Sequence, residues 1–153
     1  MTRTPKEEAT DLLNMLLPLA EQMLREHGEF YPYGGAMRPD GVMEMFGASD
    51  EKVLGLDDDD AERPSCKKLY ELLAGAFRHF AMEGRFKATG IVYDVLTVPP
   101  GATEKTDAIA VRLDHEAGDS VVVMVPYRVD DGRVTKGTIF AVKGDGSLFP
   151  AKR

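Results

Sequence analysis

The chain is poor in the residue types that most often carry chemistry. Its 153 residues include one cysteine, three histidines and no tryptophan. A single cysteine excludes an internal disulfide, which agrees with a reducing compartment. No complete catalytic, metal-binding or nucleotide-binding motif is present. The sequence therefore favours a protein that is not an enzyme, with no catalytic residues, no metal site and no cofactor.

Long apolar runs are missing as well. The longest apolar stretch, near the N-terminus, is interrupted by Asn14 and Pro18 and is far shorter than a bilayer span. Acidic residues stand close to the N-terminus, where a signal peptide would be basic. These features predict a cytoplasmic protein that has no membrane partner.

Positive charge is scarce in the first part of the chain. Residues 1–62 carry 15 Asp or Glu against 5 Lys or Arg, whereas residues 63–153 carry 11 against 14, so the net charge of −7 is unevenly placed. An acidic segment of this kind repels polyanions and attracts basic proteins. Nucleic acid is therefore not expected as a partner.

Two helices are predicted. The first begins after Thr4, whose hydroxyl and the side chain of Glu7 form a capping box, and it ends at Gly28. The second covers about residues 66–83, with Ser65 as N-cap and Gly84 as stop. Its apolar residues repeat with helical spacing: Leu69, Leu72, Leu73, Ala76, Phe77 and Phe80.

Strands are predicted wherever β-branched and alternating residues lie between turn signals. They cover residues 30–37, 42–46, 87–98, 107–115, 120–127 and 133–143. The order α-β-β-α-β-β-β-β predicts one α+β domain, residues 1–153, with an antiparallel sheet of five to six strands. Residues 121–125 are apolar on both sides, so this strand is expected at the centre, covered on both faces. We expect both helices on one face and a second copy of the chain, in a possible homodimer, on part of the other.

Residues 47–64 are predicted to form a mobile acidic loop. The run from Asp57 to Asp60 lacks the alternation and the glycine of a calcium-binding loop. Four adjacent like charges are best solvated, so the run is interpreted as a solvated loop.

Two short motifs carry a resemblance. Phe30-Tyr31-Pro32-Tyr33-Gly34 and, later, Val125-Pro126-Tyr127 resemble landmarks of a sparsely characterised family of small bacterial proteins, in which a helix precedes an FYPYG hairpin and a later strand ends in Val-Pro-Tyr. The resemblance implies an architecture and no activity. At the level of the fold, a hairpin, a crossing helix and a meander are similar to the profilin, PAS and roadblock domains.

The single thiol offers one enzymatic alternative. Cys66 stands at a predicted helix N-terminus beside Lys67 and Lys68, where a thiolate is favoured. A thiol-dependent enzyme also needs a base, and His27, His79 and His115 have no diagnostic spacing to Cys66. A structural cysteine is the favoured interpretation.

The aromatic hairpin is the main candidate site. Tyr31 and Tyr33 are expected on one face of an extended segment, with Gly34 allowing close approach and Met37 and Met43 adding adaptable apolar surface. Two interpretations stay open: these residues close the gap between the first helix and the sheet, or they form an interaction surface.

Two classes of function follow. The favoured class is a non-enzymatic protein-interaction module, regulatory or protective toward an unidentified protein partner. The alternative is a small-ligand sensor whose pocket, between helix and sheet, is lined by Tyr93, Met124, Tyr127 and Phe140.

Overall fold

The computed structural model describes residues 3–47 and 65–149. Helix α1 (Pro5–His27) begins with the predicted capping box: the amide of Glu7 donates to the Thr4 hydroxyl at 3.1 Å, and the Glu7 carboxylate accepts from Thr4. It ends at Gly28, whose φ of 73° lies in the left-handed region. The predicted start and stop of this helix are confirmed.

Helix α3 (Cys66–Met82) is also where the sequence places it. The Ser65 hydroxyl accepts from the amide of Lys68 at 3.2 Å, and Gly84, with φ 75°, follows the last turn. Phe77 is fully buried, whereas Leu72 and Phe80 are partly buried against the same cluster. Neither described helix is long and apolar enough to cross a membrane. Apart from Gly47, the predicted acidic loop lies outside the described residues.

The strands form one antiparallel sheet in the order β2-β1-β3-β4-β5-β6, with β7 also paired to β5. Their bounds are β1 Tyr33–Met37, β2 Met43–Phe46, β3 Ala88–Thr97, β4 Thr106–His115, β5 Ser120–Asp130, β6 Arg133–Lys136 and β7 Phe140–Lys143. The α+β class, the antiparallel sheet and the two helices are thus as predicted. The described residues contain seven strands rather than five or six, because predicted strand 133–143 is divided.

Pro126 explains the division. Tyr127 pairs with Lys136 and Met124 pairs with Phe140, so two residues of β5 face three on the edge strand. Proline has no N–H to donate to a ladder and is found at bulges and edges. The carbonyl of Pro126 still accepts from the amide of Gly137 at 2.8 Å, and the extra residue of the edge strand is accommodated in residues 137–139.

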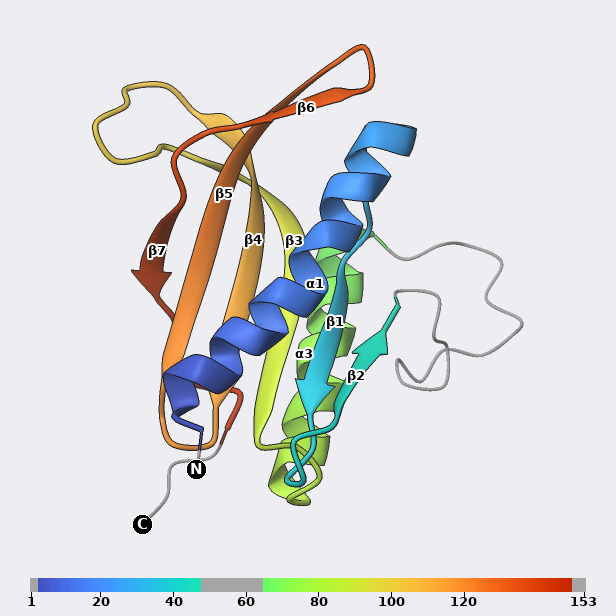
Figure 1. Ribbon diagram of the computed structural model, residues 1–153, viewed down its shortest axis with the longest axis vertical. Coiled ribbons are helices and arrows are strands. Elements are labelled where there is room, and N and C mark those ends of the chain that lie inside the picture. Colours follow the sequence, from blue (N-terminus) through green and yellow to red (C-terminus); the bar gives the residue numbers. More distant parts are fainter. Residues whose placement is uncertain (1–2, 48–64, 150–153) are drawn as a thin grey trace.

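The helices lie on opposite faces of the sheet. In Figure 1, α1 (blue) lies in front of the sheet and α3 (green) lies behind it. Tyr33 and Met37 of β1 belong to the cluster around α1, whereas Ala36, from the other face of β1, belongs to the cluster around α3. The expectation that both helices share one face was wrong, and no second copy of the chain is needed to cover the face behind β1 and β3.

The strand covered on both faces is β4, not β5. All residues from Ala108 to His115 are buried, whereas Val121, Val123 and Met124 of β5 are only half-buried. The sequence pattern predicted that one face of β4 is exposed to solvent, because Arg112, Asp114 and His115 interrupt its apolar residues. These three side chains are buried because each has a charged or hydrogen-bonding partner.

Candidate functional site

Two consecutive glycines let the two helices approach β1 from opposite sides. A Cβ on Gly34 would lie 2.8 Å from Phe77 Cε2 of α3, and a Cβ on Gly35 would lie 2.9 Å from Leu16 Cδ2 of α1. Real Cβ atoms do not approach other atoms so closely, and glycine is the residue that permits such contacts. Gly34 therefore serves helix packing and does not lie on a surface where a partner could approach it.

Three of the five predicted interaction residues are interior. Tyr33 is 2 % exposed and Met37 is 3 % exposed, and Gly34 is also buried. The hydroxyl of Tyr33 donates to the backbone carbonyl of Leu16, and burial raises the pKa of this phenol. The prediction that Tyr31 and Tyr33 share one surface was wrong: Tyr31 precedes β1 and is exposed, whereas Tyr33 points into the core under α1.

The exposed part of the hairpin is its second strand. Val42, Met43 and Met45, which we call the β2 edge surface, are 46 %, 37 % and 44 % exposed. Met43 pairs with Met37 and Met45 with Gly35, so both methionines stand on the α1 side of the sheet. Of the predicted interaction residues, Tyr31 and Met43 are the two that the structure leaves at the surface.

The backbone of β2 also faces outward at these methionines. The amide of Arg38 donates to the carbonyl of Val42 at 2.8 Å, which makes this a hydrogen-bonded pair. Such pairs alternate along an antiparallel ladder, so Glu44 and Phe46 are the next residues bonded to β1. The N–H and C=O groups of Met43 and Met45 consequently point away from β1, toward a side of β2 on which no strand of the described residues pairs.

The predicted ligand pocket is divided between the two faces. Tyr93, Ala110, Met124 and Phe140 are consecutive cross-strand partners, so Tyr93, Met124 and Phe140 form one row. Tyr127 belongs to the cluster under α1 on the other face, where its hydroxyl donates to Asp94 at 2.8 Å. The four residues therefore do not line one pocket, since side chains three positions apart on a strand point to opposite faces.

The environments of the two tyrosines differ in detail. Tyr93 packs on Tyr70 of α3, with 4.6 Å between ring centroids. Burial, and to a smaller extent the nearby Tyr70, raises the pKa of Tyr93 to about 12. Burial also raises the pKa of Asp94, although the hydrogen bond from Tyr127 opposes this.

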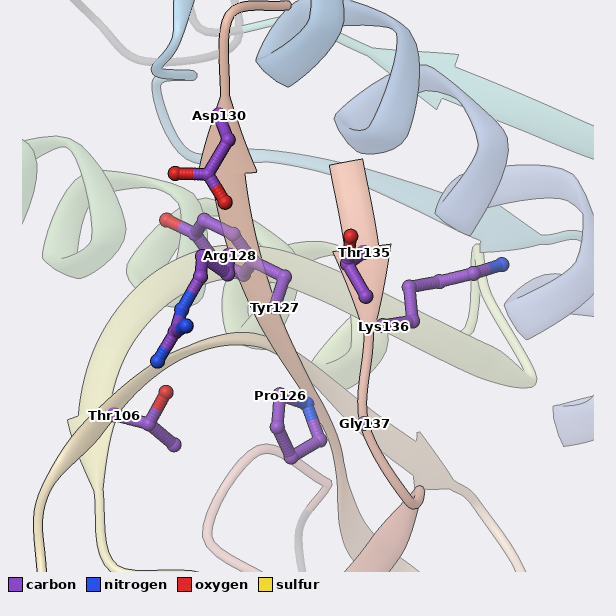
Figure 2. Close-up of a pocket in the computed structure, with 8 residues that line it drawn as sticks. All are labelled: Thr106, Pro126, Tyr127, Arg128, Asp130, Thr135, Lys136 and Gly137. Carbon is purple, nitrogen blue, oxygen red and sulfur yellow. The ribbon is translucent and has the colours of Figure 1, made fainter. Parts of the chain in front are cut away.

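A groove of about 330 Å³ lies beside the β5–β6 hairpin (Figure 2). It is lined by Thr106, Pro126, Tyr127, Arg128, Asp130, Thr135, Lys136 and Gly137. Figure 2 shows the guanidinium of Arg128 pointing toward Thr106, whereas the side chain of Lys136 extends away from the other lining residues. The Lys136 ammonium donates to Glu21 of α1 at 2.9 Å. Of the four predicted pocket residues, Tyr127 alone borders this groove.

A buried ionic cluster joins the start of α1 to the sheet. The Glu8 carboxylate accepts from the Lys87 ammonium and from His115 Nε2, the latter at 3.0 Å. His115 Nδ1 accepts from the amide of Ala117 at 3.0 Å, so the Nε2 atom carries the proton. Burial by itself raises the pKa of Glu8, but the hydrogen bonds from Lys87 and His115, together with the charge of Lys87, outweigh it and lower the pKa.

A second buried cluster surrounds Arg112 on the α3 side. Its guanidinium donates to Asp114 at 2.8 Å, to the Tyr70 hydroxyl at 3.0 Å and to Asp145 at 2.9 Å. Burial disfavours the charged guanidinium, but these partners keep the pKa above its ordinary value. Sequence reasoning missed both clusters; charged residues inside an otherwise apolar strand were the available signal.

The thiol has no catalytic partner in the described part of the chain. Cys66 is exposed at the first position of α3. The histidines are engaged elsewhere: His27 with Glu26, His79 with Glu83, and His115 with Glu8. Residues 3–47 and 65–149 also contain no group of three side chains that could hold a metal ion.

No family model, no curated protein and no solved structure matches the chain. The resemblance to FYPYG-hairpin proteins therefore stays a prediction. The β2 edge surface and the groove are the two candidate functional sites of the described residues.

Proposed function

We propose that the protein is a non-enzymatic interaction module that binds an extended, basic segment of a partner protein along the free edge of β2. The observation that carries this proposal is that β2 is the terminal strand of the sheet within residues 3–47 and 65–149. Its exposed side chains are methionines, and its backbone groups at Met43 and Met45 point away from β1. An added strand gains main-chain hydrogen bonds from such an edge and selectivity from the alternate side chains.

The two edges of the sheet differ in a way that supports this assignment. Folded proteins usually protect a sheet edge with lysine, proline or a bulge, because unpaired strands invite association. The β6–β7 edge has a bulge and exposes Arg133, Lys136 and Lys143. Strand β2 contains no basic residue and no proline. Its only charged side chain, Glu44, is held by Arg38 at 3.0 Å.

Charge favours a basic partner over a second copy of the chain. Residues 1–62, which include the hairpin, carry three times as many acidic as basic residues, 15 against 5. Opposite charge accelerates encounter, whereas two copies of this segment repel each other. Methionine side chains adapt to different apolar partners. A module that binds in this way regulates or protects its partner by occupying it.

The test is a selection from a random peptide library displayed on phage. Peptides enriched on the wild-type protein are expected to combine Lys or Arg with alternating apolar residues and to lose binding to Met45→Lys, which places a charge in the surface. Val142→Lys is the matched control, since Val142 is 43 % exposed on β7 at the opposite edge. Binding should also slow amide exchange at Met43 and Met45.

Peptides that bind Met45→Lys as tightly as the wild type, or amides at Met43 and Met45 that exchange equally fast with and without peptide, would show that β2 is not the binding edge. Enrichment of acidic peptides would contradict the charge argument.

A further inference from the structure

The groove of Figure 2 carries two opposite charges that no described residue neutralises. Arg128 and Asp130 both line it and both are exposed. Neither side chain forms an ion pair or a hydrogen bond with another residue in the described part of the chain, nor do they pair with each other. They stand two positions apart on β5, which places them on the same side of the strand with Cα atoms about 7 Å apart.

The rest of the lining is polar but uncharged toward the groove. Thr106 and Thr135 contribute hydroxyl groups, and Pro126 and Tyr127 contribute apolar surface. Lys136 contributes no free cation, since its ammonium is held by Glu21. One cation, one carboxylate and two hydroxyls thus line a groove of about 330 Å³, which is near the lower limit for small-molecule sites, and the Thr106 hydroxyl donates to the Asp107 carbonyl at 3.5 Å.

This arrangement discriminates between classes of ligand by charge. A phosphate or a dicarboxylate is attracted by Arg128 but repelled by Asp130. A simple amine is attracted by Asp130 but repelled by Arg128. A ligand with a carboxylate and an ammonium a few ångströms apart satisfies both groups through charge-assisted hydrogen bonds of about 2.8 Å at either end. The planar guanidinium accepts a carboxylate in bidentate fashion.

We infer that the groove binds a free α-amino acid as its zwitterion, with the carboxylate on Arg128 and the ammonium on Asp130. The Thr106 hydroxyl, toward which Arg128 points, donates to the same carboxylate. The amino-acid side chain lies against the ring of Pro126, the residue that also forces the break between β6 and β7. This site is independent of the β2 edge surface, which lies at the opposite edge of the sheet.

The experiment compares ligands that lack one charge at a time, with NMR titration of the labelled full chain. The probes are leucine, N-acetyl-leucine, which lacks the ammonium, and leucinamide, which lacks the carboxylate; serine and glutamate extend the side chains sampled. On the wild type, leucine should shift the amides of residues 127–137 and bind at least about tenfold more tightly than either analogue.

The variants assign each end of the ligand. With Arg128→Gln, leucine and leucinamide should bind equally weakly, because the carboxylate has lost its partner. With Asp130→Asn, leucine and N-acetyl-leucine should bind equally. Arg133→Gln, an exposed arginine of the same hairpin outside the groove, should bind leucine like the wild type. Arg128→Lys keeps the charge but loses bidentate geometry, so it should bind leucine more weakly.

Three results would overturn the inference: no shift of groove amides with leucine, serine or glutamate; analogues that bind as well as leucine; or inorganic phosphate that binds more tightly than any of the amino acids. Both altered residues are exposed, and urea midpoints equal to the wild type verify that the variants are folded. Met45→Lys should bind leucine normally, so failure here and failure of the proposed interaction function are distinguishable.

Discussion

The close contacts at Gly34 predict that Gly34→Ala destabilises the protein. The new methyl group would lie 2.8 Å from Phe77 Cε2 and 2.8 Å from the carbonyl oxygen of Gly90. The phenyl ring can shift slightly, but the backbone carbonyl of a paired strand cannot move cheaply. Overpacking of this kind typically costs about 1–3 kcal/mol.

An opposing effect comes from the unfolded state. Replacing glycine by alanine restricts the unfolded chain, which by itself stabilises a protein by about 0.4–1 kcal/mol. With the middle value of each range, the net loss in the free energy of unfolding for Gly34→Ala should be about 1–2 kcal/mol. Gly75→Ala is the matched control. Gly75 is an exposed residue within α3, and nothing lies within 4 Å of the position of its Cβ, so this change should stabilise the protein by about 0.5–1 kcal/mol.

Urea titration measures both effects. With a denaturant slope of about 2 kcal/mol/M, Gly34→Ala should lower the midpoint by roughly 0.5–1 M while Gly75→Ala raises it. Adding Phe77→Leu makes room for the methyl group, so the two changes together should cost less than the sum of their separate costs. If Gly34→Ala proves as stabilising as Gly75→Ala, the helix–sheet contact at this glycine is not as close as the structure indicates.

Three further predictions concern the buried charges and the thiol. Arg112→Ala should lower the free energy of unfolding by about 3–5 kcal/mol in urea titration, because it leaves the carboxylate of Asp114 buried without its partner. Glu8→Gln should lower the free energy of unfolding at neutral pH. Because the pKa of Glu8 is depressed in the folded state, its contribution to stability is present above the unfolded pKa of about 4.3 and disappears as pH falls through the folded pKa. The stabilities of the wild type and Glu8→Gln should therefore converge in acid, and a difference that stays constant with pH would contradict this. Cys66→Ser should change stability by less than about 0.5 kcal/mol, because the side chain is exposed on the first turn of α3.

Local chemistry accounts for the elements that sequence reasoning placed well. Thr4, Gly28, Ser65 and Gly84 satisfy or end helical hydrogen bonding within one turn, so their positions are readable without the fold. The β-branched residues of 87–98 and the alternation of residues 107–115 likewise predict strands. The register of the paired strands, which the sequence did not predict, puts Tyr93, Met124 and Phe140 in one row and leaves Tyr127 on the other face.

The candidate sites were harder to predict from the sequence. Arg128 and Asp130 resemble ordinary solvent-facing positions of a strand, and their significance depends on the groove formed with Thr106 and residues 135–137. Met43 was predicted at the surface and is exposed, whereas Met37, which was predicted beside it, is buried. Whether a tyrosine of the FYPYG run is core or surface depended on which residue starts the strand.

The sequence by itself determined the helix ends, the positions of most strands and their antiparallel pairing, because these depend on backbone geometry and on contacts within a few residues. Only the tertiary structure decided which helix covers which face, why Gly34 and Gly35 stand side by side, and how Arg112 and His115 are buried. The alternation along a strand predicts which side chains share a face, but whether that face is buried depends on residues far away in the chain. Those distant neighbours decide how much free energy it costs to bury a charge, and whether a position has room for a Cβ atom.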